Sequence, residues 1–140
     1  MILNNDQIFT LGNGGFGKIN YANLETEHAL SVYKLRRAVV KQYNELCAMR
    51  GEIMADAWAD KDVAARVAEY QKTGGGMTKE EYDAAVAQAT GKATQMLLAI
   101  GEEKHDIDVA PIPFAAWLQL LKDNDCLVGT EEILADFIAG

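Results

Sequence analysis

One long stripe of apolar residues dominates the first half of the chain. From residue 23 to residue 57, apolar positions recur at steps of three, four and seven, as on one face of an α-helix: Leu24, Val32, Leu35, Val39, Tyr43, Leu46, Ile53 and Ala57. Asn23 is a favourable N-cap and no proline interrupts the stripe, so the pattern predicts a helix of about 35 residues. Such a helix is about 50 Å long. A domain of this size cannot cover it alone, which predicts helix pairing between subunits or a protruding hairpin.

A second helical pattern follows a clear break. Residues 60–72 continue the helical spacing, and the glycines at 74–76 then interrupt it. Thr78 and Glu81 have the T-x-x-E spacing of a capping box. The next helix is predicted to end at Gly101 and carries apolar residues at helical spacing: Tyr82, Ala85, Val86, Ala89, Ala93, Met96, Leu97 and Ile100. The pattern therefore predicts a long antiparallel helical hairpin.

Shorter elements are predicted at both ends of the chain. Residues 1–11 predict a short strand, and residues 19–21 predict a second extended piece. An alternating pattern over residues 107–112 predicts an edge strand, because prolines lie at positions 111 and 113. Residues 114–121 predict a short amphipathic helix. Thr130 is predicted to cap a last helix that contains Ile133, Leu134, Phe137 and Ile138.

Together these patterns predict an α+β fold that is mainly α. Its centre is the long antiparallel helical hairpin, with a few short strands and a small C-terminal helical region. The chain has 140 residues, which suits a single domain over residues 1–140.

Composition limits the partners. The net charge is −8, which argues against generic nucleic-acid binding because that requires a basic surface. No apolar run is long enough to span a membrane, and the first residues lack the features of a secretory signal. Cys47 and Cys126 are far apart in apolar settings, which predicts two buried, reduced thiols. These features predict a cytoplasmic protein.

The charge is unevenly distributed. Residues 31–50 have a local balance of +4, so the rest of the chain sums to −12. Lys34, Arg37 and Lys41 recur at i, i+3 and i+7 and share one side of the predicted helix. Such a stripe either pairs with acidic residues of a neighbouring helix or binds a phosphate-bearing ligand or an acidic protein.

Residues 12–19, GNGGFGKI, match both a kinase glycine-rich loop and a P-loop in spelling. Ile19 stands where a P-loop needs a Ser or Thr for magnesium, and no H-R-D segment follows, which argues against both. A glycine-rich turn remains, or an anion site in which backbone amides and Lys18 bind without catalysis. The candidate anion or nucleotide site is therefore Asn13, Gly14, Gly15, Lys18, Lys34, Arg37 and Lys41.

No other pattern indicates catalysis. The acidic turn over residues 102–108 matches no known metal-ligand spacing and is typical of a solvated surface. Neither cysteine has a C-x-x-C partner, and no serine triad can be assembled. We expect no enzymatic activity, no cofactor and no metal.

Several short segments carry a recognisable layout: ILNN at 2–5, YKLRR at 33–37, YNEL at 43–46, GEE at 101–103 and IDVAPI at 107–112. In their order and spacing they resemble a loose group of small proteins encoded by phages and prophages, mostly of unknown function. The GNGGFGK loop departs from that group, whose members have a helical turn there. The group offers no catalytic residues to carry over.

The resemblance implies a non-enzymatic binding protein of a phage or prophage, and the long helices indicate that it forms a homo-oligomer through them. One implied role is counter-defence in the host cytoplasm, by sequestering an anionic nucleotide immune signal or by blocking a host defence protein. The alternative is a structural or assembly role in the virion or tail. Neither role involves generic nucleic-acid binding or a membrane.

Overall fold

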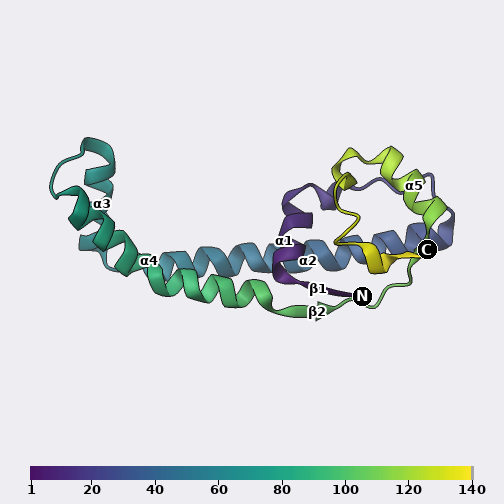
Figure 1. Ribbon diagram of the computed structural model, residues 1–140, viewed down its shortest axis with the longest axis horizontal. Helices are drawn as coiled ribbons and strands as arrows, with labels where there is room; N and C mark the ends of the chain where they lie inside the picture. The colour runs from purple at the N-terminus through teal and green to yellow at the C-terminus, as the bar shows by residue number, and fades with distance from the viewer. Residues whose placement is uncertain (140) are drawn as a thin grey trace. The chain divides into compact units, whose positions relative to one another are not determined.

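The computed structural model describes residues 1–139, which are mainly helical with short strands in two small sheets (Figure 1). The helices are α1 (Asn5–Asn13), α2 (Thr26–Ala57), α3 (Lys61–Thr73), α4 (Lys79–Glu102) and α5 (Phe114–Asp123). The mainly helical α+β class predicted from the sequence is confirmed.

The contacts divide the chain into two compact units. The first consists of residues 1–46 with the residues from 102 on, and the second of residues 47–101. Helix α2 contributes residues to both units. The single domain over residues 1–140 that the sequence suggests stays a prediction.

The core of the first unit is built on the first part of α2. Val32, Leu35 and Val39, spaced three and four apart on one helical face, are at most 1% exposed. Trp117 of α5 is also buried. Burial of these large apolar side chains is the main favourable term that holds the unit together.

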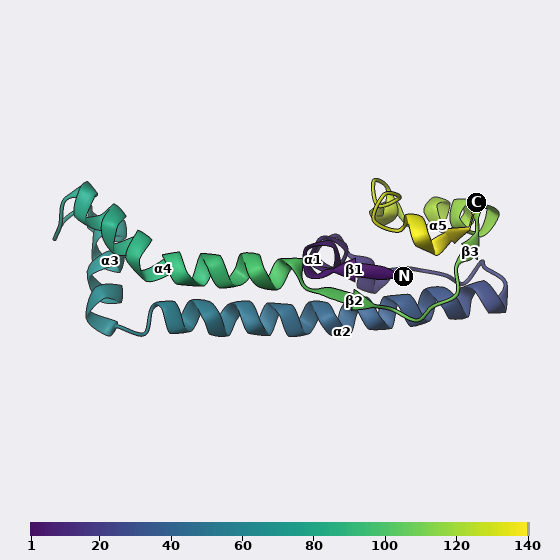
Figure 2. The ribbon, with the colours of Figure 1, turned by 60° about the horizontal axis from the view of Figure 1, so that its bottom comes forward.

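Two small sheets join segments that are distant in sequence. Strand β1 (Ile2–Asn4) pairs antiparallel with β2 (Lys104–Asp106), with Leu3 opposite His105, and the two lie side by side in Figure 2. Strand β3 (Ile112–Pro113) pairs parallel with β4 (Ile138–Ala139). The first sheet sets residues 104–106 beside the N-terminal segment, and this position matters for the candidate site.

The strand predicted over residues 1–11 is wrong beyond Asn4. Asn4 and Gln7 form a reciprocal capping box. The Asn4 side chain accepts a hydrogen bond from the Gln7 backbone amide at 2.8 Å, and the Gln7 side chain accepts one from the Asn4 backbone amide at 2.9 Å. The turn-rich residues at 4–6 therefore start helix α1, which buries Ile8 and Leu11. Residues 19–21 form no strand, although the backbone at Ile19 is extended.

Helix α2 begins at Thr26, three residues after the predicted cap. The Asn23 side-chain amide instead donates to Asp123 Oδ2 at 3.0 Å, and the Gln119 side-chain amide donates to the same oxygen at 3.0 Å. The hydrogen bonds from Gln119 and Asn23 lower the pKa of the Asp123 carboxyl. Their stabilising contribution is therefore present above the ordinary aspartate pKa and is lost as the pH falls through the lowered one.

The predictions for the C-terminal segment are partly wrong. Strands occupy residues 104–106 and 112–113, on either side of most of the predicted strand. The Thr130 hydroxyl donates to the Leu127 carbonyl at 2.7 Å and caps no α-helix. A short 3₁₀ helix, Ala135–Phe137, and strand β4 replace the predicted helix, although Leu134 and Phe137 are buried as its pattern suggested. Both cysteines are exposed free thiols, so the prediction that they are buried is wrong.

The turn between α3 and α4 forms as predicted. Gly74 has a φ of +71° and its amide donates to the Tyr70 carbonyl at 2.8 Å, which closes α3. Thr78 and Glu81 form the predicted capping box, with reciprocal hydrogen bonds of 3.1 and 3.3 Å. Helix α4 ends one residue beyond the predicted Gly101.

Asn124 is a buried polar residue that joins two segments of the first unit. Its side-chain amide donates to the carbonyls of Asn20 (2.7 Å) and Leu120 (2.9 Å), and its oxygen accepts from the Asn20 amide at 2.7 Å. An aspartate in this position cannot donate either of the two amide hydrogen bonds.

We expect Asn124→Asp to lower the free energy of unfolding by about 1–3 kcal/mol, because two carbonyls would lose their donor and face a carboxylate. Asn44→Asp makes the same change at an exposed position of α2 and is the control. Urea unfolding followed by circular dichroism measures both variants. Equal stability of the two would contradict a structural role for Asn124.

Candidate functional site

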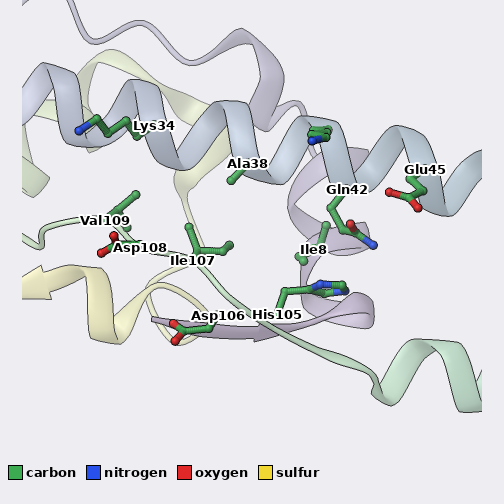
Figure 3. A pocket seen from close by; sticks show the side chains of 11 residues that line it. Ile8, Lys34, Ala38, Gln42, Glu45, His105, Asp106, Ile107, Asp108 and Val109 are labelled. Atoms are coloured by element: carbon green, nitrogen blue, oxygen red, sulfur yellow. The ribbon is translucent and has the colours of Figure 1, made fainter.

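A groove of about 430 Å³ lies in the first unit, between α2 and the segment that begins at β2. Ile8 of α1 and Ile107 contribute apolar surface. Figure 3 shows the side chains of α2 along one side and those of the segment on the other. The lining residues are Ile8, Lys34, Ala38, Lys41, Gln42, Glu45, His105, Asp106, Ile107, Asp108 and Val109.

A cluster of polar side chains connects three elements at this groove. His105 Nε2 lies 2.7 Å from the side-chain oxygen of Asn5, and the side-chain amide of Gln42 donates to the same oxygen at 3.3 Å. Asn5 is 2% exposed, and its backbone amide donates to the Glu103 carbonyl at 2.9 Å. Because an amide oxygen only accepts, His105 donates from Nε2 in this contact. The cluster holds the imidazole in place and joins α1, α2 and β2.

The charges that line the groove have both signs. Lys34, Lys41 and Glu45 belong to α2. Asp106 and Asp108 lie on the segment that faces this helix across the groove. Two ammonium groups thus share the groove with three carboxylates. A ligand with several phosphate charges would meet repulsion from these carboxylates, whereas a surface that carries both signs would find complementary groups.

The structure brings together only part of the predicted anion site. Lys34 and Lys41 line the groove, whereas Arg37 is exposed on the same helix and does not. None of the lining residues comes from the glycine-rich loop that holds Asn13, Gly14, Gly15 and Lys18. Binding of an anion by the predicted set stays a prediction.

The glycine-rich loop follows the C-terminus of α1 and does not follow a strand. Three of its amides have local acceptors: those of Gly14, Gly15 and Lys18 donate to the carbonyls of Thr10 in α1, Gly12 and Gly15 at 3.1, 3.3 and 3.0 Å. The C-terminal end of a helix carries partial negative charge, which disfavours an anion. This geometry does not favour phosphate binding by the loop backbone.

Packing and backbone conformation explain why two positions of this loop are glycine. A Cβ atom on Gly12 would overlap the ring of Tyr43 on α2, so only glycine allows this close approach. The Tyr43 ring also packs against Phe9, with a centroid distance of 5.5 Å. Gly15 has a φ of +95°, a conformation that favours glycine, and it leads into the 3₁₀ helix Phe16–Lys18.

We expect Gly12→Ala to lower the free energy of unfolding by about 1–3 kcal/mol, because the added methyl group must displace the Tyr43 ring. Gly51→Ala places the same methyl group on α2 where no atom lies within 4 Å, and should raise the stability by up to about 1 kcal/mol. Thermal and urea unfolding measure both. A neutral Gly12→Ala variant would show that the close approach is not required.

Arg36 and Arg37 are neighbours with different roles. The Arg36 guanidinium donates to the Ile19 carbonyl at 3.0 Å and to the Tyr21 hydroxyl at 3.4 Å. It also lies 4.9 Å from the Tyr21 ring centroid and 5.8 Å from that of Tyr33. Arg36 therefore ties the segment before α2 to the helix.

We expect Arg36→Ala to lower the free energy of unfolding by about 1–3 kcal/mol through the lost hydrogen bonds and cation–π contacts. Arg37→Ala should change it by less than about 0.5 kcal/mol, because that side chain is exposed. The pair is compared by urea unfolding under identical conditions. If the Arg37 variant were the less stable one, the role assigned to Arg36 would be wrong.

Sequence reasoning missed most of the groove. Gln42 and Glu45 follow Lys34 at i+8 and i+11, so extending the basic stripe along its helical face could have found them. No periodicity in the sequence indicates that His105 and Asp106 line the groove, because the pairing of β2 with β1 brings them there. In the described part of the chain, no group of three or more His, Cys, Asp or Glu side chains could hold a metal ion.

Comparison with known proteins adds no relative: no family model, curated protein or solved structure matches the chain. Among residues 1–139, no helix is both long enough and apolar enough to cross a membrane.

Proposed function

We propose that this is a non-enzymatic assembly protein that packs its helical unit, residues 47–101, against other copies of itself. In the setting implied by the resemblance to small phage and prophage proteins, this is a structural or assembly role in the virion or tail. The observation that supports it is the sparse core of this unit.

The burial of apolar side chains differs sharply between the units. Nineteen hydrophobic side chains are buried among the described residues, and only Val67 and Ala93 of these belong to residues 47–101. Large apolar side chains of this unit are exposed instead: Met54 is 36%, Met96 43% and Leu98 67% exposed.

Isolated helices are marginally stable in water, and their stability in proteins comes mainly from packing an apolar face. A unit of this length with so few buried apolar residues gains little from its own core. Packing against another protein would supply the missing burial, which favours an assembly role.

The site geometry supports nucleotide sequestration less well. The groove holds three carboxylates beside its two lysines, and the amides of Gly14, Gly15 and Lys18 donate to nearby backbone carbonyls. Counter-defence by blocking a host protein would use the same helical unit with a different partner. The distinguishing property is self-association, which an assembly protein must show and a blocking protein need not.

We expect the mass measured by light scattering to rise with protein concentration. Ala93→Asp should abolish this rise, because Ala93 is 3% exposed and a buried charge would disrupt the helical unit. Thr94→Asp adds the same charge at the exposed neighbouring position and is the control, which should still associate.

A constant monomeric mass over the whole concentration range would contradict the assembly role and favour the blocking role. Nucleotide released from the purified, heat-denatured protein would instead favour sequestration. Association that Ala93→Asp leaves intact would show that the first unit provides the contact.

A further inference from the structure

A second groove, of about 330 Å³, lies within the helical unit, between the end of α2 and the middle of α4. The two helices run side by side in antiparallel directions here, as Figures 1 and 2 show. The apolar lining combines small and large side chains: Ala57, Ala89, Ala93, Ile53 and Met96. We call this the hairpin groove.

The small side chains matter for what can enter the hairpin groove. Three of the lining residues are alanines, and these small side chains leave room for apolar side chains of a partner. Ile53 and Met96 provide further apolar surface, and Met96 is 43% exposed. An apolar helix face packed here would therefore bury surface that the chain by itself leaves in water.

Two opposite charges flank the hairpin groove from different helices. Asp56 stands on α2 and Lys92 on α4, and both line it. Neither takes part in an ion pair among residues 1–139. Asp56 belongs to the part of α2 that lines the groove, between Ile53 and Ala57, and Lys92 belongs to the part of α4 that lines it, between Gln88 and Met96. The acid and the base therefore line the same groove from its two different helices.

We propose that the hairpin groove is the contact surface for a second copy of this chain, related by a two-fold axis that runs along the groove. The proposal rests on the assembly role proposed above and names its partner and its surface. Such an axis sets α2 of one copy over α4 of the other. Asp56 of each copy then lies opposite Lys92 of the second copy, and two ion pairs close together.

This arrangement explains why the occupant is a second copy. In a two-fold contact the same patch serves both partners, so the patch must be self-complementary. An acid on one wall and a base on the other meet this requirement, whereas two charges of one sign would repel under the same operation. Packing along the groove would produce a four-helix arrangement of two helices from each copy.

Charge exchange tests the proposed pairing. Asp56→Lys places two lysines opposite each other, and Lys92→Glu places two carboxylates opposite each other, so each variant alone should dimerise about tenfold more weakly. Lysine suits the last turn of α2, and glutamate is a good helix former within α4, so both variants should keep their helicity. Circular dichroism checks this.

The decisive sample is the mixture of the two variants. Its heterodimer would carry two opposite-charge pairs, so association should return to about the level of the unmodified chain, as should that of the double variant. Analytical ultracentrifugation with one variant labelled measures the hetero-association. Failure of the mixture to associate more tightly than either variant alone would overturn the proposed pairing.

An apolar pair of variants tests the surface independently of charge pairing. Met96→Asp changes a side chain in the hairpin groove, and Leu98→Asp changes a more exposed one on α4 outside it. Only the Met96 variant should lose dimer. If Leu98→Asp dissociates the protein and Met96→Asp does not, the contact uses another face; a monomeric unmodified chain would instead overturn the assembly role itself.

Discussion

The apolar face of α2 is the feature on which the rest of the structure depends. Its first part buries Val32, Leu35 and Val39 almost completely, and the core of the first unit forms around them. The helix continues where that core ends, because no proline lies before Ala57. Its remaining turns enter a unit with very little core of its own. The uneven burial of the molecule follows from this single continuous helix.

In the glycine-rich loop, packing requirements place glycines at the same positions as in a nucleotide-binding motif. Gly12 lets α1 approach the Tyr43 ring on α2, and Gly15 adopts a left-handed conformation that leads into the 3₁₀ helix Phe16–Lys18. Glycine is required at both positions because the chain passes from α1 into the following turn within a few residues. Neither involves a ligand, and the amides of Gly14, Gly15 and Lys18 donate to nearby backbone carbonyls. Spacing alone does not distinguish these causes, since glycine serves both.

The two grooves differ in what they can recognise. The groove beside β2 mixes lysines with carboxylates around His105, and the hairpin groove is mainly apolar, with Gln88 and one charged residue from each helix. Neither concentrates positive charge as a site for several phosphates would. Both are better matched to protein surfaces, on which apolar area and charges of both signs occur together. This match is one reason for the proposal that the protein associates with another protein surface.

Local patterns in the sequence determined the long helices, the break at Gly74, the capping box at Thr78 and the mainly helical class, because these depend on residues within a few turns of each other. The same local rules were misleading near the ends. The pattern over residues 1–11 predicts a strand, whereas the capping box at Asn4 starts a helix. The apolar positions Leu134 and Phe137 predict a helix, whereas a short 3₁₀ helix and a strand form there.

Only the tertiary structure decided the candidate sites. Lys34 and Lys41 could be found on one helical face from their spacing, but their partners His105 and Asp106 are contributed by a strand that follows the entire second unit. The sequence also placed Lys18 and Gly15 in a shared site with these lysines, and the structure does not bring them to the groove. Periodicity records which face a side chain occupies on its own helix. It contains no information on which distant segment packs against that face, because that choice depends on the burial and hydrogen bonding of the whole chain.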